Sequence, residues 1–382
     1  MPLEPTTTIR QPGKADVPKL AEFFGFVYGP GSVFSDARFV DYYFFSDTRP
    51  DGSSGSWLVE SDAGEIVGFY GGLVNRLCVR GEVVTVTWGI NAVNHPEWRK
   101  LGMTGAVLQK NIDMRTWHAI VGFVERAARY YHENGYQFFD FRKFKRYAYV
   151  LSAEETLEAV RYIGQDEAAA EAIFSSATIP APTEDRRDVI RLDGAALDRY
   201  ELRIQPPVEI STFRDRAQVE KRFLDHPYIA YTLHGVLRDE RITAYVACRE
   251  ETLQPLGHRV NRIVDLAGSA DDIPLLLGHL VARSRTMGHA YIDFAVFGEC
   301  YDAALSASGF ARLPDDAFGI LPQVCSPIEY RENVEFMGLL PPPEFALTRP
   351  LLEADVYFTR MDADRDRVGS LGQVRPALQE AS

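Results

Sequence analysis

The chain has 382 residues, of which 46% are hydrophobic and 25% charged, and its formal net charge is −13. This length predicts two domains with separate cores, and the acidic charge argues against nucleic-acid partners, which bind basic surfaces. Four scattered cysteines without a Cys-x-x-Cys pair argue against a metal site or disulfides and fit a reducing compartment. We find no signal-peptide core and no apolar run of membrane-spanning length, so we expect a cytoplasmic protein with no membrane partner and no metal. The sequence leaves open a monomer or a homodimer.

The first half of the sequence predicts two helices followed by a series of strands. Residues 14–28 have helical spacing, and 34–45 form a second, aromatic helix. Segments 56–61, 65–79 and 82–93 have strand patterns, with turns at residues 62–64 and 80–81. We then expect a helix over about 104–115, a buried strand over 117–125 and a short helix closed by Gly135.

The next segment predicts one long strand over residues 137–151. Ser152 followed by Glu155 is typical of a capping box, and it opens an alanine-rich helix to about Ser176. Residues 178–187 have linker composition, so we predict a first domain over 1–178 and a second over 188–382.

The second half repeats this order of helices and strands. Phe123-x-Glu125 precedes Gly135-Tyr136 at the same spacing as Phe297-x-Glu299 precedes Gly309-Phe310, and the two sets are 174 residues apart. That distance is too long for a repeat of the solenoid kind. The pattern therefore predicts a duplicated domain.

The stretch from Val93 to Gly105 joins a strand to a helix in a way that is typical of an anion site. The first N–H groups of a helix are unpaired and, with the helix dipole, favour phosphates. Arg99-x-x-Gly102-x-Thr104 adds a cation and a glycine that lets a ligand approach the backbone. Neither a Walker loop nor a dinucleotide-binding glycine pattern is present here.

Two motifs resemble the GNAT superfamily of N-acyltransferases. Val93-x-x-Pro96-x-Trp98-Arg99-x-x-Gly102-x-Thr104 resembles its acyl-CoA pyrophosphate loop, with one extra residue before the proline, and Ala127-x-x-x-Tyr131-x-x-x-Gly135-Tyr136 resembles its fourth-helix signature. The resemblance implies acyl-CoA as co-substrate and no metal. It implies that the pyrophosphate is held by Arg99, Lys100, Leu101, Gly102, Met103, Thr104 and Gly105. The strand edge around Asn91 and Val93 would pair with the pantetheine amides.

The same resemblance implies direct attack of an amine on the thioester, with Tyr131 as the general acid for the leaving thiolate. Core packing is the alternative role for Tyr131. The general base stays open: the strand before the loop has threonines and Asn91 but no carboxylate or histidine. His95, Glu125 and His226 are candidates, although His95 also suits a cap of the loop and Glu125 a structural role.

The second half resembles the same fold without the chemistry. Asp271 and Asp272 stand where a diphosphate would bind, and Leu305 stands at the position of Tyr131. We therefore predict an α/β chain of mixed sheets, with two GNAT-like domains in tandem, the second degenerate and contributing to the acceptor site.

Tandem chains of this size resemble FdhC-like nucleotide-sugar N-acyltransferases, which implies an amino sugar on dTDP or UDP as the acceptor. The residues carrying this resemblance include Tyr42 in an aromatic helix, His226 in His-Pro-Tyr, and Asp364 in the tail Asp362-x-Asp364-x-Asp366-Arg367. We expect that tail to be a solvated turn or a site for sugar hydroxyls. Two alternatives remain: an acyltransferase for another small amine, such as an antibiotic or siderophore precursor, and a non-catalytic protein that binds acyl-CoA or a nucleotide sugar.

Overall fold

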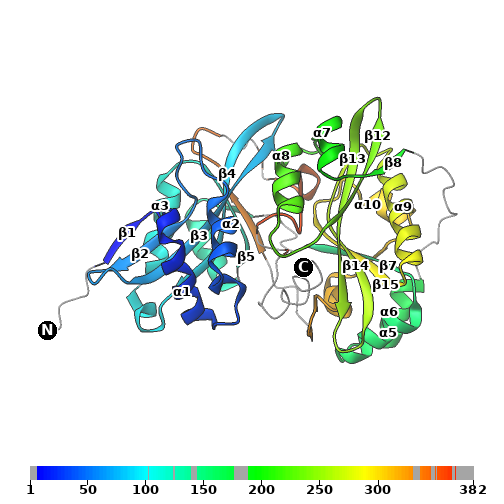
Figure 1. The fold of residues 1–382 in the computed structure, drawn as a ribbon, viewed down its shortest axis with the longest axis horizontal. Coiled ribbons are helices and arrows are strands. Elements are labelled where there is room, and N and C mark those ends of the chain that lie inside the picture. Colours follow the sequence, from blue (N-terminus) through cyan, green and yellow to red (C-terminus); the bar gives the residue numbers. More distant parts are fainter. Residues whose placement is uncertain are drawn as a thin grey trace.

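The structure, a computed structural model, describes residues 7–101, 103–123, 125–138, 144–175, 188–329, 336–345, 349, 351–363 and 366; of these, 100, 101, 103, 104, 122, 123, 125–127, 138 and 336 are described by their backbone alone. Two halves lie side by side, each a sheet covered by helices (Figure 1). The chain up to the linker forms β1 (Thr7–Arg10), η1 (Lys14–Asp16), α1 (Val17–Tyr28), η2 (Val33–Ser35), α2 (Ala37–Phe45), β2 (Trp57–Ser61), β3 (Ile66–Val79), β4 (Glu82–Asn94), η3 (Pro96–Leu101), α3 (Met103–Asp113), β5 (Trp117–Phe123), α4 (Glu125–Glu133), β6 (Gln137–Phe138), β7 (Lys145–Val150), α5 (Ala153–Tyr162) and α6 (Glu167–Ser175).

After the linker the elements continue in a similar order. They are β8 (Val189–Arg191), α7 (Gly194–Arg199), β9 (Glu201–Ile204), β10 (Ile210–Thr212), β11 (Arg214–Asp215), α8 (Arg216–Val219), the π-helical turn η4 (Glu220–Leu224), β12 (Thr232–Arg238), β13 (Arg241–Leu253), β14 (His258–Gly268), α9 (Ile273–Thr286), β15 (His289–Phe297), α10 (Asp302–Ala307), β16 (Ala311–Arg312), η5 (Asp315–Ile320), β17 (Val324–Cys325), β18 (Ile328–Glu329), β19 (Phe336–Leu340), η6 (Glu353–Asp355) and β20 (Val356–Thr359).

The first-half sheet runs β1-β2-β3-β4-β5-β19-β6, and among these described strands the β4–β5 pair alone is parallel. Arg80 and Gly81, between β3 and β4, have φ of 51° and 87°, as a type I′ hairpin turn requires. Successive side chains face opposite ways. Phe69 packs on Phe24 of α1, whereas Tyr70 packs with Leu108 of α3. Helices α1 and α2 thus cover one face and α3 the other.

The second-half sheet repeats these pairings. Its order is β8-β12-β13-β14-β15-β7, antiparallel as far as β14, parallel between β14 and β15, and antiparallel again to β7. Helix α9 follows β14 as α3 follows β4. The predicted mixed α/β fold of two similar copies is confirmed.

Each half also receives a strand from the other side of the predicted linker. Strand β7 and helices α5 and α6, which precede the linker, lie in the second half (Figure 1), where β7 pairs with β15. In return β19 pairs with β5 and β6, and β10 pairs with the end of β3. The division into 1–178 and 188–382 stays a prediction, and this exchange ties the two halves together.

Two expected elements are divided. The strand predicted over 137–151 is two strands, β6 and β7, that belong to different halves, and residues 139–143 between them lie outside the described chain. The alanine-rich helix predicted to Ser176 is α5 and α6, because Gly164 between them has φ of 70° and interrupts the helix. Ser152 does cap α5, since its hydroxyl accepts a hydrogen bond from the Glu155 N–H.

Candidate active site

Strands β4 and β5 separate partway along the first-half sheet. Their parallel pairing runs from Val86–Trp117 to Gly89–Ile120, and β4 then continues to Asn94. Asn91, predicted to meet the pantetheine arm, has φ of 46° beside a register shift against β3, which bends the strand as a β-bulge does. No strand of the described chain pairs with this second edge of β4 beyond Gly89, so the edge is available to a ligand with amide groups.

The predicted pyrophosphate loop follows directly. It forms η3, and α3 begins at Met103, so N–H groups of the first turn of α3 follow the loop, as an anion site requires. The Arg99 side chain is exposed. Gly102 lies outside the described residues, and only the backbones of Lys100, Leu101, Met103 and Thr104 are described.

Histidine 95, a candidate base, closes the start of this loop. Its Nδ1 accepts a hydrogen bond from the Glu97 N–H at 3.4 Å, its carbonyl accepts from the Trp98 N–H, and its ring stacks on Phe26 at 4.8 Å. These contacts are those of a loop cap. A role for His95 as base stays a prediction.

Tyr131, the predicted general acid, lies on α4 with its side chain half-buried. Its ring meets that of Tyr136 edge-on at 5.1 Å. Burial, with the neighbouring Tyr130, raises the pKa of Tyr131 to about 12. At neutral pH the phenol is protonated, so it can give a proton but not take one. The Glu125 side chain, the other candidate on α4, is not among the described side chains.

A buried polar cluster where β4 and β5 separate was not predicted from the sequence. A Cβ at Gly89 would come within 2.1 Å of the Tyr70 hydroxyl and 2.9 Å of the His118 ring. His118 Nδ1 is 2.6 Å from the Tyr136 hydroxyl, and its Nε2 has no hydrogen-bond partner among the described residues. Burial, with Arg49, lowers the pKa of His118 to about 3, so the imidazole is neutral at physiological pH and a weak base. The strand alternation placed His118 on β5, but only the packing shows what it faces.

A pocket lies on the other face of β4, where α2 meets α8 and η4 of the second half. It encloses about 550 Å³ of space, part of it open to solvent, and adjoins a hollow of about 650 Å³. Trp88, one residue before Gly89, lines the pocket. The other lining side chains are Tyr42, Tyr43, Phe44, Asp47, Leu73, Val74, Asn75, Gln218, Lys221, Arg222, Met361 and Ala363. The pocket therefore reaches β4 where its pairing with β5 ends.

Tyr42, predicted to bind substrate, lines this pocket, and its hydroxyl donates to the Lys221 carbonyl at 2.9 Å. His226, also predicted, lies behind Tyr42, with ring centroids 5.2 Å apart, and does not line the pocket. Its Nδ1 accepts from the N–H groups of Tyr228 and Ile229, and burial lowers its pKa to about 3. Substrate binding by His226 stays a prediction.

The acidic tail was expected to be a solvated turn or a site for sugar hydroxyls, and its two described aspartates are not solvated. Asp362 and Asp366 are buried: Asp362 accepts from Thr212 and from the Thr359 N–H, and Asp366 accepts from Tyr231 at 2.6 Å. Because the neighbouring strand β20 packs in the core, these carboxylates are buried with it. Hydroxyl and N–H donors take the place of water as their hydrogen-bond partners. Asp364, predicted to bind substrate, and Arg367 lie outside the described residues.

In the second half, the chain itself covers the strand edge that corresponds to the open edge of β4. The β14–β15 pairing ends at Ile263–Phe294, and β20 then pairs with β15. The Met361 N–H donates to the Val264 carbonyl, and the Tyr301 hydroxyl contacts both the N–H and the carbonyl of Gly268. The chain itself therefore occupies the edge of β14.

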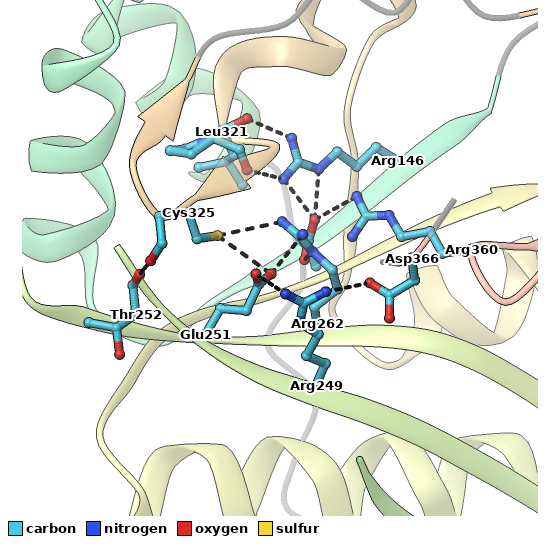
Figure 2. Close-up of polar contacts among 12 residues, drawn as sticks. Arg146, Arg249, Glu251, Thr252, Arg262, Leu321, Cys325, Arg360 and Asp366 are labelled. Carbon is cyan, nitrogen blue, oxygen red and sulfur yellow. Dashed lines mark hydrogen bonds and ion pairs between the residues drawn. The ribbon is translucent and has the colours of Figure 1, made fainter. Parts of the chain in front are cut away.

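Charged side chains stabilise this closed region. Arg146, Arg262 and Arg360, which are labelled in Figure 2, all donate to the buried carboxylate of Asp293, at 2.7 to 3.2 Å. Arg249 bridges Glu251 and Asp366 beside them. At the position of a diphosphate, Asp272 accepts from Thr243 and pairs with Arg238. In the described part of this half, the carboxylate at that position is therefore already paired within the protein.

Within the described part of the chain, no group of three histidine, cysteine or acidic side chains is placed to hold a metal ion. In the same residues, no helix is long and apolar enough to cross a membrane.

No protein-family model and no curated protein sequence matches the chain. Solved structures with a similar fold include a probable N-acyltransferase from Enterococcus faecalis (10% identity, 87% of this chain and 72% of that one, TM-score 0.53). They include a GCN5-related N-acetyltransferase from Anabaena variabilis (10% identity, 87% and 72%, TM-score 0.51). They also include Saccharomyces cerevisiae N-myristoyltransferase with bound myristoyl-CoA and inhibitors (13% identity, 90% and 82%, TM-score 0.51). These similarities show that the fold is that of the GCN5-related N-acyltransferases.

Proposed function

We propose that the protein is an acyl-CoA-dependent N-acyltransferase with its donor site in the first half and its acceptor site at the junction of the halves. The observation that carries this is the separation of β4 and β5 at Gly89, with the pocket at Trp88 on the adjacent residue. A donor lying along β4 would bring its thioester to the end of that pocket. The similar structures of N-acyltransferases support the same activity.

In this mechanism the donor is held by backbone. The pantetheine amides pair with β4 around Asn91 and Val93, and the N–H groups from Arg99 to Gly105 hold the diphosphate with help from the Arg99 guanidinium. The acceptor amine, unprotonated, attacks the thioester carbonyl directly. Tyr131 gives its proton to the departing thiolate, and the proton that the attacking nitrogen loses restores the Tyr131 phenol, so the products are the amide and CoA.

We propose a nucleotide-linked amino sugar as the acceptor. The pocket combines aromatic rings, amides and cations: Tyr42 and Trp88, Asn75 and Gln218, and Lys221 with Arg222. Rings and amides suit a sugar or a base, and the cations suit a diphosphate. Another small amine would use the same pocket without the two cations.

Calorimetric titration with acetyl-CoA, dTDP and UDP, followed by chromatographic measurement of released CoA, tests this proposal. We expect acetyl-CoA and a nucleotide to bind together, and CoA to appear only when an amine acceptor is added. Reversing the loop cation in Arg99→Glu should weaken acetyl-CoA binding by about tenfold or more, from roughly 1–4 kcal/mol of lost attraction.

The control is Arg312→Glu, the same reversal at an exposed arginine of the second half. Binding of acetyl-CoA without nucleotides would point to another amine acceptor. Binding without CoA release from any amine would identify the non-catalytic alternative, and no binding of acetyl-CoA would refute the donor site.

A further inference from the structure

Lys221 lies in the pocket that we assign to the acceptor. It lines both the pocket beside Trp88 and the adjoining hollow. It belongs to η4, a π-helical turn, and such turns are rare and often found at functional sites. It is also the last lysine of the sequence, in a second half whose other basic side chains are arginines and histidines. A primary amine of the protein thus lies in the pocket that we assign to the acceptor.

The Lys221 ammonium contacts the carboxylate of Asp47, which lines the same pocket from the end of α2. Its side chain is 28% exposed, so it reaches solvent through the pocket. Two of the other described lysines differ: Lys14 of η1, paired with Asp41 at 3.5 Å, is 70% exposed, and Lys145 is buried between Asp302 and Glu353. Neither lines the pocket.

The pKa of Lys221 is lowered, which suits a nucleophilic amine. Burial, followed by the neighbouring Arg222, lowers its pKa to about 7, and the Asp47 contact opposes this by favouring the charged form. A fraction of the amine is therefore unprotonated near neutral pH, whereas an exposed lysine is almost fully charged.

We propose that Lys221 is acylated by the protein's own donor when no acceptor fills the pocket. This inference rests on the proposed function. The unprotonated Nζ attacks the thioester carbonyl of acyl-CoA, a C–N bond forms and the C–S bond breaks. The proton lost by nitrogen balances the one gained by the thiolate, so the products are an amide on Lys221 and free CoA.

Acylation changes the pocket. The amide is neutral, so the ion pair with Asp47 is lost, and the acyl group occupies space that the acceptor needs. Protein acylated at Lys221 should therefore turn over acceptor more slowly than unmodified protein. The acceptor should protect Lys221, because a diphosphate bound beside it favours the charged form of the amine, which is not nucleophilic.

The test is incubation of the full chain with acetyl-CoA alone, followed by intact-mass measurement and peptide mapping of the acetylated site. We expect one acetyl group per chain at Lys221 and less than a tenth as much at Lys14. A non-specific surface reaction would favour Lys14, which is the more exposed amine. Lys221→Arg should remove the added mass, and Lys14→Arg should leave it in place.

Acetylation of Lys14 or other lysines to the same extent as Lys221 overturns the proposal, as does an unmodified chain. Because the site is mapped in the wild-type protein, the result does not depend on how well the Lys221→Arg variant folds. If acetyl-CoA binds and an added amine releases CoA, an unmodified Lys221 refutes this inference alone. If acetyl-CoA does not bind, the proposed function itself fails.

Discussion

The two copies of the fold differ most where the strand before the crossover helix parts from its parallel neighbour. In the first half β4 leaves β5 at Gly89, and beyond that residue no strand of the described chain pairs with this edge of β4. In the second half the chain's own C-terminal strand β20 takes that place, and Tyr301 closes the end of β14. The same architecture thus leaves an open strand edge in one copy, where we propose that the donor binds, and forms a packed joint in the other.

The charges follow the same division. The first copy places an exposed cation, Arg99, at the start of its crossover helix. The second copy has Asp272 there, already paired with Arg238 and Thr243, and buries its arginines around Asp293. The two copies therefore differ in whether the charged groups in this region are exposed or are paired within the protein.

The largest expected effect tests the packed joint. Asp293→Asn leaves three buried arginines without their shared carboxylate, so we expect a loss of about 3–5 kcal/mol in the free energy of unfolding. Urea denaturation measures it. Asp315→Asn, at an exposed pair 3.7 Å from Arg312, should change stability by less than about 0.5 kcal/mol.

From the Asp293 cluster we also predict how the stability of the protein changes at acid pH. Burial alone would raise the pKa of Asp293, but Arg360, Arg262 and Arg146 outweigh it and hold that pKa well below its usual range. Its contribution is therefore complete above about pH 4, the unfolded value, and is lost as the pH falls below it. Asp293→Asn should flatten this part of the stability curve, and an unchanged curve would contradict the assignment.

The next effect tests the open copy. Tyr131→Phe removes the proton donor to the thiolate and should lower turnover by about 10²- to 10⁴-fold, with acyl-CoA affinity little changed. Steady-state kinetics and calorimetry separate the two. Tyr130→Phe, whose hydroxyl donates to the Gly105 carbonyl from an exposed position, is the matched control and should keep turnover within severalfold. Wild-type turnover in Tyr131→Phe would leave core packing as its role.

A smaller effect tests the closure of the second copy. Tyr301→Phe leaves the buried N–H and carbonyl of Gly268 without their partner, which should cost about 1–3 kcal/mol of stability. Thermal unfolding and acetyl-CoA titration should show reduced stability with unchanged affinity. A weakened affinity would mean that the second copy takes part in donor binding.

The smallest effect should be equal in both copies. Gly135 and Gly309 end the helix after β5 and after β15, with φ of 87° and 85°. Alanine at either position is strained in this left-handed conformation, so each substitution should cost roughly 1–2 kcal/mol. Unequal losses would show that the two caps are not equivalent.

Much of the fold could be predicted from local pattern. Alternation marked β2 to β5, the turn residues marked Arg80-Gly81, and the repeated Gly135 and Gly309 revealed the duplication. The division of 137–151 into β6 and β7 was missed, because pattern shows that a segment is extended but not which sheet it joins.

The sequence by itself determined the strand and helix on either side of the loop from Val93 to Gly105, the helix that carries Tyr131 and the repeated order of strand, helix, strand and helix in both copies, since these depend on neighbouring residues. Only the tertiary structure decided that Asp47, Trp88 and Lys221 share a pocket, that His118 lies buried at Gly89, and that β20 fills the second copy. These contacts join residues that are distant in the chain, and their partners are chosen by packing and by the need to pair buried charges, which no local spacing records.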